Sequence, residues 1–124
     1  MVDEELRALA AGGRVRVDGD DADLSPAVAQ GLALALHELG TNALKHGCWS
    51  TADGCLALAW SPPDARRFIE MTWQESGGAV AGPPDRAGFG TTLIKRALSG
   101  GAGGDVELTW DPPGLRCKLR FPVV

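Results

Sequence analysis

What the 124-residue sequence lacks already excludes several classes of protein. It has no apolar run approaching the roughly 20 residues of a membrane-spanning helix. No basic and apolar signal segment opens the chain, so we expect a cytoplasmic protein. The net charge is −4 and no long basic run occurs, which argues against nucleic acid as the main partner. What remains is one globular domain, long enough to bury about two thirds of its unfolded surface.

Cysteine is scarce and irregularly placed. The three cysteines, Cys48, Cys55 and Cys117, form no CxxC pair and have no histidine at zinc-finger spacing. We therefore expect neither a disulfide framework nor a zinc site. Cys55 and Cys117 fall in segments of strand-like alternation, where a free cysteine behaves as a small apolar residue.

The most informative segment is LALALHELGTNALKHG, residues 32–47, which forms the second part of a predicted helix. Ser25 as the N-cap and Pro26 in the first turn predict the helix start. Gly47 predicts the end of the helix after about His46.

Two stripes run along this helix, because each residue advances about 100° around the axis. The apolar stripe, which we expect to be buried, consists of Val28, Leu32, Ala35, Leu36, Leu39 and Ala43. A narrow neighbouring stripe is polar and consists of Glu38, Asn42 and Lys45. A carboxylate, a carboxamide and an ammonium group one turn apart suit metal and phosphate chemistry better than solvation. We therefore expect the polar stripe to line a cleft.

Short alternating segments predict the rest of the fold. We expect a short helix at 3–11, an edge strand at 14–17, an antiparallel pair at 55–60 and 67–73, a glycine- and proline-rich loop at 76–90, a helix from 91 to about 98, and a hairpin of 106–110 with 115–121. Helices on one face of a mixed, mostly antiparallel sheet make a two-layer α/β sandwich. We expect one domain over 1–124, in which 1–13 is a short leading segment.

Two further segments carry polar chemistry. Residues 73–78 (WQESGG) end a strand in an acid followed by glycines, and residues 88–92 (GFGTT) lead glycines directly into a helix. The unpaired N–H groups of a first helical turn and the helix dipole favour phosphate, and glycine lets the backbone approach it closely. Each signal is weak alone. Together with the polar stripe, they occur in an order that a sheet can bring to one place.

These segments resemble the motifs of the Bergerat-type ATP-binding domain, which histidine kinases share with type II topoisomerases. HELGTNALKHG (37–47) resembles its N box, ESGG (75–78) its first glycine box, and GFGTTLIKRAL (88–98) its second. The resemblance covers nearly the whole chain, from about residue 14 to residue 124.

Two residues narrow the resemblance to one subfamily. His37 in the N box, together with the Trp73-x-Glu75 motif, resembles the HWE subfamily of bacterial sensor histidine kinases. The ending GLRCKLRFP (114–122) is also similar to the last strand of that group.

The resemblance implies ATP and Mg²⁺ as cofactors and a role for each matching residue. Asn42 is expected to hold the magnesium ion that bridges the ATP phosphates. Glu38 is expected to order a water of the metal or to act as a general base. Lys45 and His46 are expected to meet phosphate oxygens. A hard cation prefers oxygen ligands and usually keeps several waters, which agrees with these assignments.

The resemblance also assigns the base and the remaining phosphate contacts. Glu75 stands where the wider superfamily has an aspartate that accepts a hydrogen bond from the adenine amino group. Gly77 is expected to let the adenine ring pack against the backbone. The phosphates are expected to be framed by Gly88, Phe89, Gly90, Thr91 and Thr92.

Three other residues are assigned from their position on the elements. His37 lies away from the apolar stripe and from Asn42, so we expect it to support the loop by hydrogen bonding and not to be the phosphoacceptor. Trp73 shares a strand face with apolar residues, which favours a packing role. Leu34 lies nearest the polar stripe in the first half of the helix, and we expect it to touch the nucleotide.

The function implied is the catalytic, ATP-binding half of a sensor histidine kinase. It moves the γ-phosphate of Mg-ATP to a histidine on an upstream dimerisation domain that this chain does not contain, and from there the phosphate reaches a response regulator. We expect the domain alone to be a monomer without membrane contacts and the full kinase to be a dimer. Two alternatives remain: an anti-sigma-factor serine kinase of the same superfamily, and a nucleotide-binding regulatory domain without transferase activity.

Overall fold

The computed structural model describes residues 15–20, 22–48, 54–77, 91–99, 103–111 and 114–124. Most of the predicted 76–90 loop and the predicted helix at 3–11 lie outside these ranges. The described elements are β1 (Val15–Asp18), α2 (Pro26–His46), β2 (Cys55–Trp60), β3 (Phe68–Ser76), α3 (Thr91–Ala97), β4 (Asp105–Asp111) and β5 (Gly114–Pro122).

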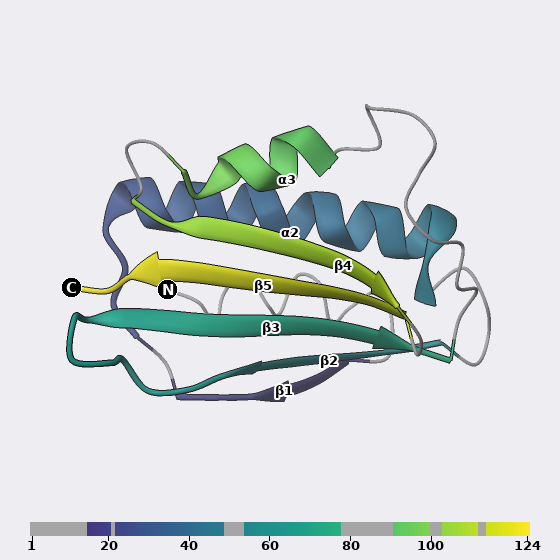
Figure 1. Cartoon of the computed structure of the whole chain (residues 1–124), viewed down its shortest axis with the longest axis horizontal. Coiled ribbons are helices and arrows are strands. Elements are labelled where there is room, and N and C mark those ends of the chain that lie inside the picture. Colours follow the sequence, from purple (N-terminus) through teal and green to yellow (C-terminus); the bar gives the residue numbers. More distant parts are fainter. Residues whose placement is uncertain (1–14, 21, 49–53, 78–90, 100–102, 112–113) are drawn as a thin grey trace.

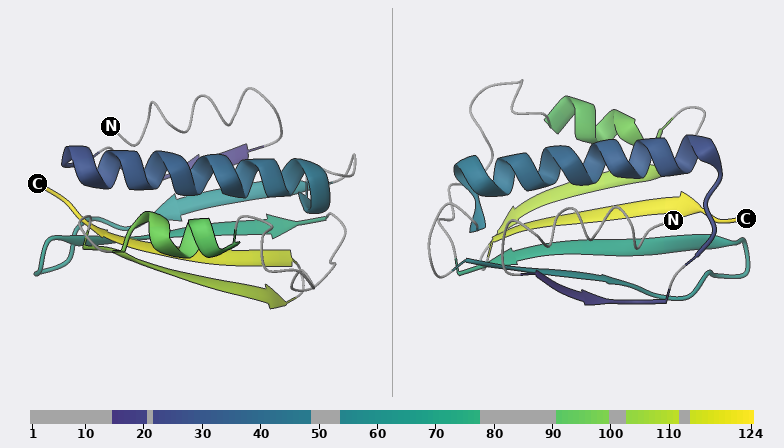
Figure 2. Two further views of the ribbon diagram at one scale, coloured as in Figure 1. Left: turned by 90° about the horizontal axis from the view of Figure 1, so that it is seen from above. Right: turned by 180° about the vertical axis from the view of Figure 1, so that it is seen from behind.

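The described strands form one five-stranded sheet in the order β1-β2-β3-β5-β4. β1 is an edge strand and pairs in parallel with β2, whereas every other pair is antiparallel. Both helices cover the same face of this sheet (Figures 1 and 2). The predicted two-layer α/β sandwich with a mixed, mostly antiparallel sheet is therefore confirmed. In the described part of the chain, no helix combines the length and the apolar character needed to cross a membrane.

Helix α2 begins and ends where the sequence predicts. The side chain of Ser25 accepts a hydrogen bond from the Val28 N–H at 3.3 Å, and Pro26 occupies the first turn. At the other end, the N–H of Gly47 donates to the carbonyl of Ala43 at 3.2 Å. All six residues of the predicted apolar stripe are at most 1% exposed.

The N-cap offers a direct test of this helix start. Replacing Ser25 with alanine is expected to lower the free energy of unfolding by about 1 kcal/mol, because a first-turn N–H loses its acceptor. The matched variant Ser25→Asp keeps an acceptor and is expected to retain most of that stability. Urea unfolding followed by circular dichroism measures both, and equal losses in the two variants would contradict the capping role.

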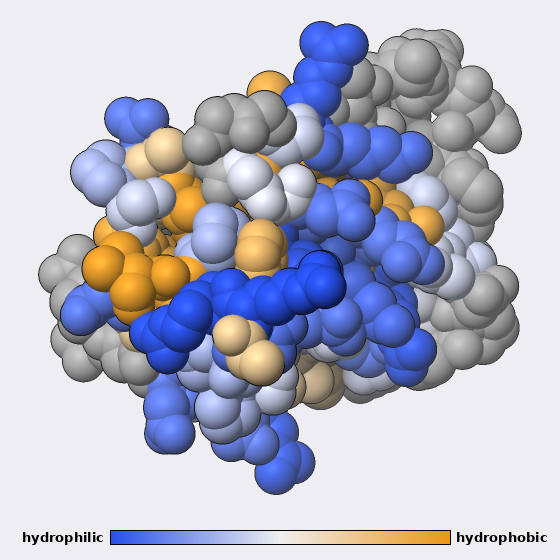
Figure 3. Space-filling view, turned by 60° about the vertical axis from the view of Figure 1, so that its left-hand side comes forward, coloured by the Kyte–Doolittle hydropathy of each residue, from blue (hydrophilic) through white to orange (hydrophobic). Residues whose placement is uncertain are grey.

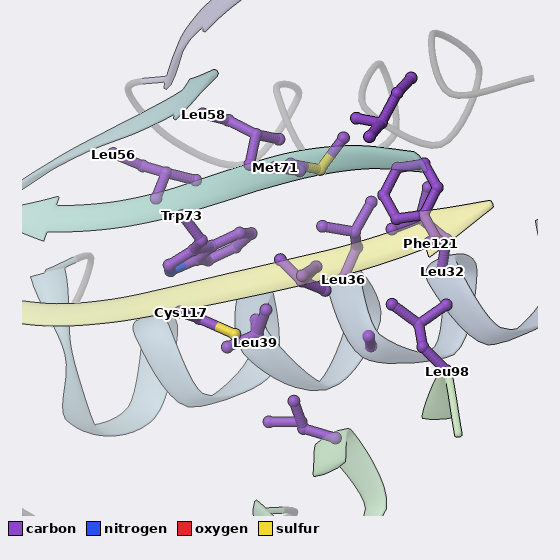
Figure 4. Close-up of a cluster of buried hydrophobic side chains, with 14 of the residues drawn as sticks. Leu32, Leu36, Leu39, Leu56, Leu58, Met71, Trp73, Leu98, Cys117 and Phe121 are labelled. Atoms are coloured by element: carbon purple, nitrogen blue, oxygen red, sulfur yellow. The ribbon is translucent and has the colours of Figure 1, made fainter. Parts of the chain in front are cut away.

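The core lies between the buried stripe of α2 and the inner faces of β2, β3 and β5 (Figure 4). Side chains alternate along these strands, so the inner rows are mainly apolar and buried, and the outer rows are exposed or half-buried. The inner rows consist of Leu56, Leu58, Ile69, Met71, Trp73, Cys117, Leu119 and Phe121. Cys48 and Cys117 are buried, as free cysteines often are, but Cys55 faces outward and is exposed. Its alternation with Leu56 places it on the uncovered face of the sheet.

The short helix α3 packs against α2 at a glycine. A Cβ atom on Gly31 would collide with the carbonyl oxygen of Ala97, so the absence of a side chain lets the two helices approach closely. Ile94 and Leu98 complete the contact and are at most 1% exposed. This contact places α3 along the side of α2 that also carries the polar stripe, because Gly31 lies two turns before Glu38.

Candidate functional site

Two of the segments that carry polar motifs end at the same side of the sandwich. The C-terminal half of α2 and the C-terminal end of β3 lie on the right in Figure 1, and α3 begins nearer the middle of the molecule, beside α2. These are the segments on which the sequence places the polar stripe, the second glycine box and the first glycine box. The fold therefore brings the motifs of α2 and β3 to the same end of the molecule, with α3 packed beside α2.

The polar stripe of α2 sits at the margin of the core. Glu38 and Asn42 are half-buried, whereas Lys45 is exposed. Within the described residues, no group of three His, Cys, Asp or Glu side chains forms a metal site by itself. Glu38 and Asn42 offer oxygen donors of the kind that Mg²⁺ accepts, with the remaining ligands left to phosphates and water. The donor set therefore fits a magnesium ion that arrives with a nucleotide.

Glu75, at the end of β3, is the one buried charged residue in the described part of the chain, with 3% of its surface exposed. Its Oε1 accepts a hydrogen bond from the backbone N–H of Cys48 at 2.9 Å. Its Oε2 accepts one from the indole N–H of Trp73, also at 2.9 Å. The carboxylate thus joins the end of β3 to the chain just after α2. Gly47 makes room for it, since a Cβ there would collide with Oε1.

The backbone at Glu75 is held by Gln74 and lies close to the neighbouring strand β5. The side-chain amide of Gln74 donates to the carbonyl of Glu75 at 2.9 Å and in turn accepts from the Nε of Arg116 at 2.9 Å. Gly114 lies so close to the Glu75 carbonyl that a Cβ there would be within 2.6 Å of the oxygen. The main chain at this position is therefore fixed by the neighbouring strand β5.

The charge of Glu75 also affects a buried thiol. Burial, and to a smaller extent the negative charge of Glu75, raises the pKa of Cys117 from its usual 9.0 to about 12. The folded state therefore keeps Cys117 protonated over a pH range in which the unfolded chain loses the proton.

This shift makes stability depend on pH. Because the folded pKa is the higher one, stability is complete below pH 9 and falls as the pH rises from 9 towards 12. Between pH 8 and pH 10 we expect Cys117 to account for a loss of about 1.4 kcal/mol in the free energy of unfolding. Urea unfolding at both pH values measures it. Cys117→Ala should remove that part of the pH dependence. Cys55→Ala, at an exposed position, should retain it. Equal pH dependence in the unsubstituted chain and in both variants would contradict the assignment of this effect to Cys117.

Several predicted site residues are placed only in part. The backbones of His46, Thr91 and Thr92 are helical, but their side chains lie outside the described set. Gly88, Phe89 and Gly90 lie outside the described residues altogether. Their roles stay predictions.

The other predicted residues have defined positions. Gly77 adopts a φ of 72°, a left-handed conformation that favours glycine, where the chain leaves β3. His37 is exposed on α2, and its carbonyl accepts a bond from the Thr41 hydroxyl at 2.9 Å. Its predicted contact with the loop falls on residues outside the described ranges. Leu34 is 38% exposed on the same helix, as a residue that contacts a ligand has to be.

Two features of the site were missed at the level of sequence. The buried position of Trp73 was predicted, but its hydrogen bond to Glu75 was not. A signal for it existed, because a buried indole N–H needs an acceptor and Glu75 is two residues away on the same strand face. The contribution of the Cys48 backbone N–H had no such signal.

A cavity of about 290 Å³ lies at the opposite end of the sheet. It is lined by the β2–β3 connection and the C-terminal residues, among them Pro62, Arg67 and Val124. Figure 3 brings this end of the molecule forward and shows a largely hydrophilic surface. None of its lining residues belongs to the predicted nucleotide site.

Comparison with known proteins identifies the family. The chain is 34% identical over 114 residues to a blue-light-activated histidine kinase of Brucella anthropi, covering 90% of this chain and 23% of that protein. It is 31% identical over 109 residues to a protein of the same name in Rhizobium johnstonii, covering 88% of this chain and 32% of the relative. Over almost its whole length, the chain is therefore homologous to one region of these histidine kinases. No family model matches it.

Solved structures agree with the fold of this kinase domain. The histidine kinase domain of the Erythrobacter litoralis EL346 blue-light-activated histidine kinase matches with a TM-score of 0.77 at 20% identity, covering 98% of this chain and 64% of that one. The catalytic domain of the histidine kinase ThkA matches with a TM-score of 0.65 at 13% identity, over 98% and 84% of the two chains. The relatives support the histidine kinase interpretation over the anti-sigma serine kinase and over a non-enzymatic regulator. The kinase domain spans only about a quarter to a third of the length of the relatives named above.

Proposed function

We propose that this kinase domain binds Mg-ATP and transfers its γ-phosphate to a histidine on an upstream dimerisation domain. The observation that carries the proposal is the position of the buried Glu75 at the same end of the sandwich as the polar stripe of α2 (Figure 1). A nucleotide site needs two parts. One is a fixed, buried acceptor for the base, and the other is a row of oxygen and ammonium groups for the phosphates and the metal.

The polar stripe serves the metal and the phosphates in this proposal. Asn42 and Glu38 hold Mg²⁺, Asn42 directly and Glu38 through water, and the bound ion neutralises phosphate charge. Lys45 and His46 meet phosphate oxygens, and the Gly88–Thr92 segment offers backbone N–H groups to them. Catalysis of phosphoryl transfer consists mainly of such positioning and charge neutralisation.

The base is recognised at the end of β3. The carboxylate of Glu75 accepts bonds from Cys48 and Trp73, and a carboxylate has about four acceptor sites, one of which receives the adenine amino group in this proposal. Gly77, which has no side chain and turns the chain away from the strand, leaves the ring face open to packing.

The transfer step involves one bond made and one broken. An imidazole nitrogen of the acceptor histidine attacks the γ-phosphorus, the bond from that phosphorus to the bridging oxygen breaks, and ADP leaves with the electron pair. The attacking nitrogen is the unprotonated one, so the N–H proton on the other ring nitrogen leaves the phosphorylated imidazole, and in this proposal Glu38 accepts that proton. His37 and Trp73 support the site without contacting the reacting atoms.

The proposal also covers the longer protein to which this domain belongs. Residues 1–124 act as one unit of a longer cytoplasmic kinase whose dimerisation domain carries the phosphoacceptor, and a response regulator receives the phosphate afterwards. Light activation is stated in the names of the relatives and is not assigned to this chain.

Reconstitution with a separate acceptor tests this function. The chain is mixed with radiolabelled ATP, Mg²⁺ and the dimerisation domain encoded upstream of it, and phosphoprotein is assayed for stability. We expect label on the dimerisation domain that is stable to alkali and lost in acid, as phosphohistidine is, and no label when EDTA removes the metal. Acid-stable label on a serine would favour the serine kinase alternative. Nucleotide binding without any label would favour the regulatory domain.

A further inference from the structure

The buried carboxylate of Glu75 is held by one side chain and one backbone group. Trp73 supplies its indole N–H, and Cys48 supplies its main-chain N–H. The Cys48 donor is present whatever side chain stands at that position. Among the described residues, Trp73 is therefore a side chain whose donated hydrogen bond to the carboxylate a substitution can remove.

We propose that Trp73 is the positioning residue for Glu75, and that its indole N–H, not its bulk alone, sets how strongly the site distinguishes adenine from other purines. This inference rests on the proposed function, because it requires Glu75 to accept the amino group of the base.

The indole N–H of Trp73 restricts the side-chain torsions of Glu75, which the fixed backbone leaves free to rotate. The main chain at Glu75 is fixed by Gln74 and Gly114, so only the side-chain torsions of Glu75 can move the carboxylate. A glutamate side chain has three such torsions. The bond from Trp73 fixes Oε2, and the bond from Cys48 fixes Oε1 in the space that the missing side chain of Gly47 leaves for it. With the indole donor removed, Oε2 loses this bond while Oε1 keeps the bond from Cys48, and the carboxylate can turn about that remaining bond.

The packing of the Trp73 ring keeps its indole N–H in a fixed position. The residue is 0% exposed and lies in the core between the sheet and α2, near Leu39, Leu56 and Cys117 (Figure 4). A ring packed in this way has no freedom to leave its acceptor, and an indole N–H buried without an acceptor is unfavourable. Trp73 and Glu75 therefore hold each other in place.

A fixed carboxylate discriminates between bases by charge. It accepts a hydrogen bond from an exocyclic amino group, as adenine has, and it repels the carbonyl oxygen that hypoxanthine carries at the same ring position. Sites built to pair with a polar group reject an analogue that lacks it far more strongly than apolar pockets do. A carboxylate free to turn away loses much of that rejection.

The test compares ATP with ITP, which differs from ATP at that position of the base. Calorimetric titration with the Mg²⁺ complex of each nucleotide gives the ratio of the two affinities. In the unsubstituted chain we expect ATP to bind at least about tenfold more tightly than ITP. In Trp73→Phe, which keeps an aromatic ring without the N–H, we expect the ratio to fall to within about threefold, mainly through weaker ATP binding.

Trp60→Phe is the matched control. Its indole N–H donates to the carbonyl of Asp20, and in the sheet Trp60 pairs with Met71, four residues before Glu75 on β3. The same substitution there removes an indole hydrogen bond without touching the carboxylate, and the ATP-to-ITP ratio is expected to stay at the unsubstituted value.

The outcomes separate this inference from the proposed function. If the unsubstituted chain binds no ATP, or binds ATP and ITP equally, the base contact of Glu75 in the proposed function is wrong. If it prefers ATP and Trp73→Phe weakens both nucleotides by the same factor, Trp73 acts only as core packing and the inference is overturned. Should Trp73→Phe fail to fold, β-(3-benzothienyl)alanine at position 73 keeps the fused rings and replaces the N–H by sulfur, and the same ratios decide.

Discussion

Replacing Asn42 with alanine is expected to weaken Mg-ATP binding by a factor of about 100 and to abolish phosphoryl transfer. Asn42 is half-buried in the polar stripe of α2, one turn after Glu38. Alanine has a high helix propensity, so the helix itself is retained. What is lost is the amide oxygen proposed to hold the metal, and with it the charge neutralisation between the phosphates and the protein.

The metal dependence of the loss identifies its cause. Calorimetric titration with ATP in Mg²⁺ and in EDTA should show a large difference between the two conditions for the unsubstituted domain and little for Asn42→Ala. Thr41→Ala is the neighbouring control, because its hydroxyl donates within the helix to the carbonyl of His37. It should bind Mg-ATP within about twofold of the unsubstituted domain, since surface changes away from a site have small effects. Unchanged Mg-ATP binding by a folded Asn42→Ala variant would show that the metal site has been assigned wrongly.

Replacing Leu36 with alanine is expected to lower the free energy of unfolding by about 2 to 5 kcal/mol. Leu36 is 1% exposed in the centre of the apolar stripe, where α2 packs on the sheet (Figure 4). The loss combines the transfer of apolar surface with the cavity that remains, and it is a large part of the roughly 5 to 15 kcal/mol that stabilise a typical domain.

The same substitution at Leu44 provides the control within one helix. Leu44 is 53% exposed, so Leu44→Ala is expected to change stability by about 0.5 kcal/mol or less. Because both changes are leucine to alanine in α2, helix propensity contributes equally to each. Urea unfolding of the two variants measures the difference, and similar effects at the two positions would mean that the buried face of α2 is wrong.

Much of the fold follows from local patterns in the sequence. Ser25 and Pro26 mark the start of α2, and the apolar spacing from Val28 to Ala43 predicts its buried face. The alternation in 55–60 and 115–121 predicts the strands and their inner rows. These features depend on neighbours a few residues apart, so a single sequence is enough to predict them.

Strand ends and pairings are less well predicted. The predicted strand at 67–73 continues to Ser76 in β3, because its pairing with β2 and the buried Glu75 extend it beyond the apolar run. Cys55 lies at a position that an apolar residue can fill, yet it is exposed, because the described helices α2 and α3 cover the opposite face of the sheet. In both cases the outcome depends on what packs against the strand.

The candidate site also combines residues that the sequence predicts with contacts that depend on the fold. Glu38, Asn42 and Lys45 share a stripe because helical spacing requires it, and their motif identifies the family without a structure. The placement of Glu75 is different. One bond comes from Trp73 on its own strand, but the other comes from Cys48, 27 residues earlier, with Gly47 leaving the space.

Local patterns in the sequence predict most of the described elements, their buried faces and the candidate site residues, because these depend on short-range periodicity and on side-chain type. Only the tertiary structure decided how the carboxylate of Glu75 is held. Its partner Cys48 donates a backbone N–H, which every residue except proline possesses, so no residue type marks the contact. The contact exists because the packing of α2 on the sheet brings the end of the helix beside the end of β3.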